Sequence, residues 1–310
     1  MNNNSQQLLL KPTTAQTYKI LHDKPLGNGG FGSLYQCIDT SSGNDQLAVK
    51  LESCSTNNND SNKTSLYLES KILKYLQGGI GIPKYISFIT SKDFNFLVME
   101  LLGDNLEIIF SSYKKNLSLQ TIINISIQML NRIEFLHSKG FIHRDIKPEK
   151  FVLGKRKHNK DIVYLIDYGL TKPFLNGKTK THVPYVEGKN FLGTPRYASP
   201  NSHLGIALSR RDDVISFVYC VIYFLKGSLP WENLKKRKED HRYMDIFNLK
   251  MGLISNNCYF KDDIDVNIMN LMKYVMNLKY EEMPDYKMIK CLLQKIKDID
   301  IDKEEISKEG

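Results

Sequence analysis

The chain has 310 residues, of which 41% are hydrophobic and 25% are charged. These proportions are ordinary for a globular protein with a sizeable core, so wholesale disorder, a collagen-like rod and a coiled-coil rod are excluded. The 43 lysines and arginines outnumber the 34 aspartates and glutamates, and the net charge of +9 favours acidic partners without identifying their class. At about 150 residues per domain, the length predicts two domains or two lobes.

The cysteines and the apolar segments bear on where the protein resides. The five cysteines are odd in number and scattered, and no CxxC pair suggests a metal site. A reducing compartment is therefore expected, that is, the cytoplasm, the nucleus or both. The N-terminus lacks the charged and apolar regions of a signal peptide. The longest nearly apolar run, 214–225, is shorter than the ~18 residues that span a membrane, so no span is expected.

Strand-like patterns dominate the first third of the chain, after a polar stretch, 1–17, that is expected to be an N-terminal tail. Between residues 18 and 50, apolar positions alternate around a glycine cluster, which is typical of strands. Apolar residues at helical spacing then predict a helix over 66–76, which a glycine pair ends. Residues 94–102 predict one more strand.

The remainder of the chain is predominantly helical in pattern. Residues 117–137 place apolar side chains on one face of a long helix that ends before Gly140. The segments 214–225 and 266–278 also predict helices, whereas 297–310 is charged and poor in apolar residues and is expected to be a solvated C-terminal tail. The prediction is an α+β fold with a small strand-rich lobe and a larger helical lobe, whose bounds are 18–101 and 102–296.

A GxGxxG pattern lies at residues 27–32, where missing side chains would let backbone N–H groups approach a phosphate closely. Alone the pattern is weak, because it also fits an ordinary glycine-rich hairpin. In a dinucleotide-binding turn, a helix would follow the glycines. Here the segment 33–39 predicts a second strand, so a hairpin that lies over a ligand is favoured.

Three further motifs follow in a fixed order. Lys50 ends a predicted strand, and Glu69 lies on the next predicted helix. A lone strand lysine is usually a solvated charge, but a lysine held by a helix glutamate is a paired part of phosphoryl-transfer enzymes. His-Arg-Asp at 143–145 and Asp-Tyr-Gly at 167–169 come later. This order is difficult to obtain by chance and is typical of the eukaryotic-type protein kinase fold.

Later motifs narrow the resemblance. They are GTPRYAS at 193–199, SRRDD at 209–213 and GSLPW at 227–231. This set resembles the casein kinase 1 family of Ser/Thr kinases, which also lacks the usual A-P-E after the activation segment. Tyr168 resembles the related vaccinia-related kinase branch, but the GTxRYAS block favours casein kinase 1. The resemblance covers about residues 18–295 and implies a bilobal protein kinase fold.

The resemblance implies ATP and Mg²⁺ as cofactors and assigns a role to each charged motif residue. Lys50 would contact the ATP phosphates and Glu69 would orient it, while Asp167 would hold Mg²⁺. Asp145 would accept or orient the proton of the substrate hydroxyl, and Lys147 would stabilise the phosphoryl group in transfer.

The resemblance also implies a substrate amino acid and a nucleotide site. Lys147 and Thr194 together resemble Ser/Thr rather than Tyr kinases. The adenine slot is expected around Leu34, Ala48 and Met99. The residues expected to bind the nucleotide are Leu26, Gly27, Gly29, Gly32, Leu34, Ala48, Lys50, Met99, Glu100, Leu102 and Lys150.

Basic residues lead to a substrate hypothesis. Arg196, Arg242 and Lys189 fall where family members present cations to an anion, and arginine suits a phosphate because its fork donates two parallel hydrogen bonds. Protein substrates that are acidic or already phosphorylated are therefore expected. The alternative is that these are ordinary surface cations. The basic run 235–238 is more typical of a solvated loop than of a nucleic-acid patch.

One departure from the family pattern leaves the activity open. Protein kinases carry an asparagine that binds a second Mg²⁺ where this chain has Lys150, and an ammonium group cannot bind a cation. Glu149, Ile215 and Val218 are milder departures. The first hypothesis is an active Ser/Thr kinase with one principal metal. The second is a pseudokinase that serves as a nucleotide-binding module, a scaffold or part of a larger assembly. A nucleic-acid binder would explain the charge but none of the motifs.

Overall fold

The computed structural model divides into two compact units. One consists of Met1–Gly103 and Leu153–Gly169, and the other of Asp104–Val152 and Leu170–Gly310. The Asp-Tyr-Gly motif therefore belongs with the N-terminal unit, although it follows the His-Arg-Asp motif in the sequence. The structure describes residues 9–10, 18–21, 24–29, 32–41, 45–53, 64–232, 234, 239–255 and 263–306.

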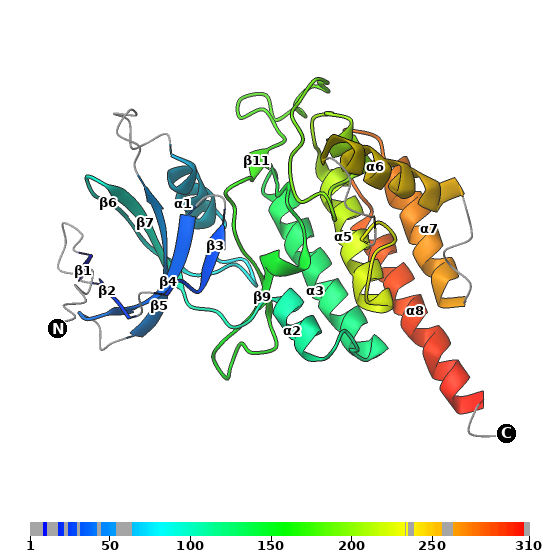
Figure 1. The fold of residues 1–310 in the computed structure, drawn as a ribbon, viewed down its shortest axis with the longest axis horizontal. Helices are drawn as coiled ribbons and strands as arrows, with labels where there is room; N and C mark the ends of the chain where they lie inside the picture. The colour runs from blue at the N-terminus through cyan, green and yellow to red at the C-terminus, as the bar shows by residue number, and fades with distance from the viewer. Residues whose placement is uncertain are drawn as a thin grey trace. The chain divides into compact units, whose positions relative to one another are not determined.

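The first unit is built on an antiparallel sheet (Figure 1). Six strands follow in the order β1-β2-β4-β5-β7-β6, and β3 pairs with β4. The strands are β1 (Leu9–Leu10), β2 (Tyr18–Ile20), β3 (Gly27–Gly29), β4 (Gly32–Asp39), β5 (Asp45–Ser53), β6 (Tyr85–Thr90) and β7 (Phe94–Glu100). The predicted strands are confirmed. Within the segment 1–17, which was expected to be a tail, Leu9–Leu10 form β1 and pair with β2.

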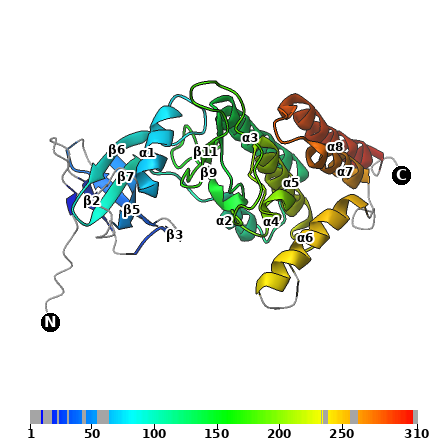
Figure 2. The same cartoon turned by 90° about the horizontal axis from the view of Figure 1, so that it is seen from above.

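The predicted helix of this unit is α1 (Ser65–Tyr75), which packs beside β6 and β7 (Figure 2). The side chain of Thr64 caps its first turn by accepting a hydrogen bond from the N–H of Tyr67. Leu66 and Leu73 are buried and fix the side of the helix that packs on the sheet. Glu69 shares this buried side, so the helix directs its carboxylate toward the strands.

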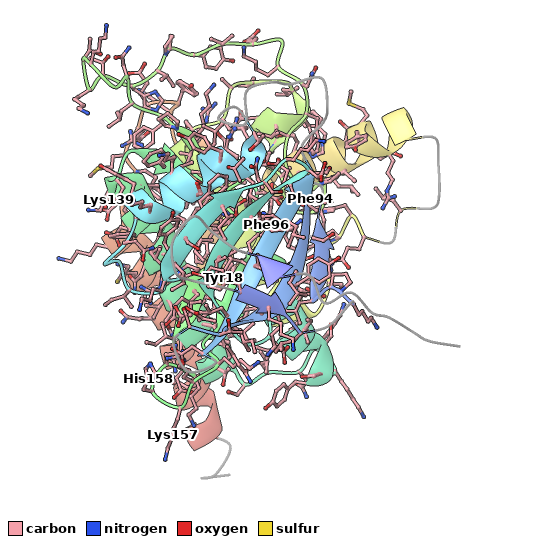
Figure 3. The ribbon with its side chains drawn as sticks, turned by 90° about the vertical axis from the view of Figure 1, so that its left-hand side faces the viewer. Tyr18, Phe94, Phe96, Lys139, Lys157 and His158 are labelled. Atoms are coloured by element: carbon pink, nitrogen blue, oxygen red, sulfur yellow. The ribbon has the colours of Figure 1, made fainter. Side chains whose placement is uncertain are left out.

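Apolar side chains on the strands form the core of the first unit. Phe96 is 3% exposed and lies in one cluster with the buried side chains of Tyr18 and Val98. Figure 3 labels Tyr18, Phe96 and also Phe94, which begins β7 and is 40% exposed. Burial of a large apolar side chain contributes about 1.5–3 kcal/mol to stability, so this cluster anchors the strands that carry the site.

The second unit is mainly helical (Figure 1). Its central helix, α5, is buried almost throughout and packs against α3 and α7. The helices are α2 (Leu106–Ser112), α3 (Leu119–Ser138), α4 (Pro200–His203), α5 (Arg210–Lys226), α6 (Glu239–Ser255), α7 (Asp263–Asn277) and α8 (Tyr286–Ile306). None of the helices in the described ranges is both long and apolar enough to cross a membrane.

Two ends of the predicted helices differ from the structure. The helix predicted over 214–225 begins earlier, at Arg210. The prediction missed its first turn because Asp212 and Asp213 break the apolar pattern, although both side chains are buried. The expected tail 297–310 is helical as far as Ile306. Lysine and glutamate are good helix formers, so a charged segment can continue a helix that packed residues have begun. The α+β fold class is confirmed.

Candidate active site

In the first unit, three charged residues meet, and we call them the Lys50 cluster. The ammonium group of Lys50 on β5 donates to Glu69 Oε2 at 2.7 Å and to Asp167 Oδ1 at 2.8 Å. Burial by itself lowers the pKa of Lys50, but the carboxylates of Glu69 and Asp167 outweigh this effect and raise the pKa above its usual value. Lys50 is therefore a fixed positive charge.

Local backbone geometry places Asp167 in this cluster. Its φ of +65° lies in the left-handed region, which aspartate tolerates better than most residues. The next side chain, Tyr168, is only 2% exposed and donates a hydrogen bond to the carbonyl of Leu165 at 2.8 Å. Leu165 lies on β10 (Val163–Leu165) and donates its N–H to the carbonyl of Gly81. These contacts fasten the Asp-Tyr-Gly turn to the first unit.

The glycine motif forms a hairpin, as predicted, and does not open a helix. Gly27 pairs with Leu34 and Gly29 with Gly32 across β3 and β4. Gly32 has a φ of +128°, and a Cβ atom there would overlap the carbonyl of Leu51 on β5. A side chain at Gly27 would meet nothing. Of these two positions, therefore, only Gly32 requires glycine for the fold. Residues 30 and 31 of the motif lie outside the described residues.

The residues expected to bind adenine share one face of the sheet. Leu34 pairs with Lys50 across β4 and β5, and Ala48 pairs with Met99 across β5 and β7. Cross-strand partners point to the same side, and so do residues two apart on one strand. Leu34, Ala48 and Met99 therefore lie on the face that carries Lys50. Leu26 is 54% exposed just before β3.

Glu100 and Leu102, two of the residues expected to bind the nucleotide, lie in different surroundings. The carboxylate of Glu100 accepts hydrogen bonds from the Asn159 side chain at 3.1 Å and from the N–H of Lys84 at 3.1 Å. Its side chain thus ties the end of β7 to two neighbouring segments. Leu102 is half-buried and lies in the irregular segment that follows β7.

In the second unit, four polar residues form what we call the Asp145 cluster. Thr194 donates its hydroxyl to Asp145 Oδ1 at 2.8 Å, and Lys147 donates to the oxygen of Thr194 at 2.7 Å. The Lys147 ammonium also lies 3.3 Å from Asp145 Oδ2. The fourth member is Lys150, on the short 3-10 helix η2 (Pro148–Lys150), and its ammonium lies 3.7 Å from the same oxygen. One carboxylate therefore has a hydroxyl and two cations around it.

A buried aspartate of α5 holds the backbone of this loop. Asp213 accepts hydrogen bonds from the N–H groups of His143 at 2.6 Å and Arg144 at 2.8 Å, and its Oδ2 lies 2.9 Å from His137 Nε2. Burial by itself raises the pKa of Asp213, but hydrogen bonding and charge from His137, followed by His143, lower it below the usual value. Asp213 thus remains a carboxylate that orients the loop.

The sequence indicated Asp213 only as part of the SRRDD motif and gave no sign of this anchoring role. Arg144 has a φ of +71°, and its side chain donates to the carbonyl of Leu170 at 2.6 Å. Two independent contacts therefore hold the residue just before Asp145. A buried acid that follows its partner His143 by 70 residues in the sequence has no local signal that would reveal this contact.

The family model of the protein kinase domain matches residues 20–291. The chain belongs to the protein kinase family. Domains of this family are those of kinases, transferases that bind ATP and act on protein substrates.

The expected anion-binding residues of this kinase are not equally available. The guanidinium group of Arg196 forms two contacts to Glu232 Oε1, at 2.9 Å from Nε and 2.6 Å from the terminal nitrogen, and it lies 4.3 Å from the centre of the Tyr223 ring. Lys189 and Arg242 are exposed, and neither forms an ion pair with another described residue. Of the three expected anion-binding residues, Arg196 is therefore already paired with a carboxylate of the protein, that of Glu232.

The side chains that could act as metal ligands fit one magnesium ion better than two. Mg²⁺ is commonly held by one or two carboxylates together with substrate phosphates, and Asp167 supplies such a carboxylate. Lys150 has only hydrogen-bond donors and cannot replace the amide oxygen of an asparagine. Within the described residues, no group of three or more His, Cys, Asp or Glu side chains could hold a metal. Asp167 thus suits an Mg²⁺ ion that takes its other ligands from the phosphates of ATP.

Proposed function

We propose that this kinase is a Ser/Thr kinase of casein kinase 1 type, which transfers the γ-phosphoryl group of ATP to protein hydroxyl groups. The observation that carries the proposal is the hydrogen-bonded chain from Lys147 through Thr194 to Asp145. It holds a carboxylate and a cation within reach of one reacting hydroxyl, and the residue types are those expected of Ser/Thr kinases.

In the first unit, the Lys50 cluster would bind the phosphates of ATP. Lys50 would turn from Asp167 to the α- and β-phosphates while Glu69 keeps its orientation. This exchange frees the Asp167 carboxylate for Mg²⁺, which supplies positive charge along the phosphates when it is bound. Leu34, Ala48 and Met99 would supply the apolar face for adenine, because they lie on the same side of the sheet as Lys50.

In the second unit, the Asp145 cluster would act on the substrate. The serine or threonine oxygen bonds to the γ-phosphorus, and the bond from that phosphorus to the bridging oxygen of ADP breaks. The hydroxyl proton passes to Asp145, and Lys147 balances the charge on the transferred group. Fixed charges in the right place supply most of the rate in such reactions, because little covalent help is needed.

A second candidate function rests on Lys150. Its ammonium, 3.7 Å from Asp145 Oδ2, supplies positive charge but no metal ligand. As a pseudokinase, the chain would bind nucleotide or a partner without transferring phosphate and would serve as a scaffold or part of a larger assembly. Melting curves with ATP address the metal site: stabilisation by ATP alone, without added Mg²⁺, would point to Lys150 as the counter-charge.

The transfer assay decides between these functions. We expect the protein to phosphorylate a serine peptide with acidic residues before the serine, and Asp145→Asn to remove most of this activity. Transfer that is equal in both proteins, or absent from both, would reject the active kinase and favour the pseudokinase.

Acidic or already phosphorylated protein substrates remain our proposal for the substrate class. It is supported by Lys189 and Arg242, which are exposed cations, and by Arg196 if a substrate phosphate displaces Glu232 from it. We also propose a cytoplasmic or nuclear location. The odd number of scattered cysteines supports it, because cysteines remain unpaired in a reducing compartment. The basic run 235–238 lies outside the described residues, and we propose no nucleic-acid partner.

A further inference from the structure

Lys250 on α6 is a buried lysine that the kinase motifs do not include. The residue is 1% exposed, and its ammonium lies 2.6 Å from the Ala198 carbonyl, 2.7 Å from the Pro195 carbonyl and 3.2 Å from His203 Nε2. No carboxylate among the described residues forms an ion pair with it. An ammonium group has three donors, and three acceptors surround this one.

The two carbonyls belong to the turn that carries Thr194. The N–H groups of Tyr197 and Ala198 both donate to the Thr194 carbonyl, at 2.9 Å and 2.8 Å. These bonds use the carbonyl of Thr194, so the carbonyls of Pro195 and Ala198 need other partners. Lys250 supplies partners for the carbonyls of Pro195 and Ala198. Its contacts lie directly beside the residue that touches Asp145.

Burial of this ammonium is costly for the protein. Burial lowers the pKa of Lys250 well below the usual value for lysine, because no carboxylate compensates for lost hydration. The rings of Trp231 and Tyr219, centred 5.0 Å and 5.2 Å from Nζ, offset part of this cost. An apolar side chain of similar length would fill the same space without the penalty. The geometry that Lys250 imposes on the turn is what an apolar residue could not provide.

We propose that Lys250 is a positioning residue for phosphoryl transfer. By holding the carbonyls of Pro195 and Ala198, it fixes the turn so that the Thr194 hydroxyl stays within 2.8 Å of Asp145 and 2.7 Å of Lys147. The kinetic part of this inference rests on the proposed function. The structural part, that Lys250 holds the turn, stands on the contacts alone.

The test compares Lys250→Met with wild type. We expect kcat to fall about 100-fold, as a misplacement near 1 Å can cause, while the affinity for ATP and the melting temperature stay close to wild type. Amide exchange of Tyr197 and Ala198 should accelerate. Lys290→Met is the matched control, because Lys290 pairs with Glu134 on the surface of α3 and touches neither the turn nor the Asp145 cluster. This control should leave kcat unchanged.

Coupling to Thr194 separates positioning from general stability. If Lys250 acts through Thr194, then adding Lys250→Met to Thr194→Val should cause little further loss of kcat. Additive losses, or a fall in melting temperature with unchanged kcat of the folded protein, would contradict the proposal. Should Lys250→Met not fold, Lys250→Gln keeps a donor and should show the same exchange pattern to a smaller degree.

The exchange measurement keeps the two proposals apart. A wild-type protein without transfer would reject the kinase function. Unchanged amide exchange at Tyr197 and Ala198 in the Lys250 variants would reject the role of Lys250, whatever the activity of the wild type.

Discussion

Lys150 places a second cation beside the carboxylate of Asp145, where the family pattern has an amide. We expect Lys150→Asn to raise kcat about tenfold at high Mg²⁺, because an amide oxygen can bind a second ion and the variant removes one of the two cations beside Asp145. Initial rates measured against Mg²⁺ concentration check this. Lys155→Asn, which changes an exposed lysine, is the control. A rate that falls in Lys150→Asn would mean that the ammonium itself assists transfer.

Glu232 holds the guanidinium of Arg196 and so competes with any acidic group on a substrate. Glu232→Gln keeps the carbonyl that accepts from the N–H of Leu229 but removes the negative charge. We expect kcat/KM for a phosphorylated peptide to rise roughly tenfold relative to its unphosphorylated form, because a charge-assisted hydrogen bond is worth about 1.5–3 kcal/mol. Peptide kinetics measure this ratio. We also expect Arg196→Ala to lower this ratio. An equal ratio in wild type and Glu232→Gln would show that Arg196 does not bind the anion of the substrate.

At the scale of elements, α4 contributes a pH-sensitive contact. Burial, followed by the nearby charge of Lys250, lowers the pKa of His203 from 6.5 to about 3. The unfolded chain therefore binds a proton below pH 6.5 that the folded chain refuses, and the free energy of unfolding should fall by about 1.4 kcal/mol per unit as the pH drops through this window.

Urea unfolding between pH 7 and pH 4 measures this dependence. His203→Gln keeps an acceptor for Lys250 but cannot titrate, so its stability should depend less on pH over the same window. Identical pH profiles for wild type and His203→Gln would show that other groups carry the acid sensitivity. Activity plays no part in this measurement, so it remains decisive for a pseudokinase.

Local sequence pattern predicted the elements that carry the motifs, because hydrophobic periodicity and glycine turns act over a few residues. It predicted the hairpin of β3 and β4, the helix that carries Glu69 and the strand that carries Lys50. It did not predict that α8 continues to Ile306 through a segment rich in lysine and glutamate, which are good helix formers. Helix ends depend on tertiary support as well as on composition.

At the scale of the whole molecule, the motifs predicted which residues meet within each unit. Lys50 with Glu69 and Asp167, and Asp145 with Lys147, lie together although long stretches separate some of them. The ion pair of Arg196 with Glu232 and the contacts of Lys250 had no such signal. They depend on how α6 and the segment that follows α5 pack on the turn at residues 194–198, and no short-range pattern encodes that packing.

The central claim is that these charges are assembled for phosphoryl transfer in spite of Lys150. It is tested most directly by measuring initial rates of transfer from MgATP to serine, threonine and tyrosine versions of one acidic peptide, with Asp145→Asn in parallel. We predict transfer to the serine and threonine peptides by the wild type, little to the tyrosine peptide, and a loss of at least about 100-fold in Asp145→Asn. No transfer by the wild type, or the same rate in the variant, would contradict the account.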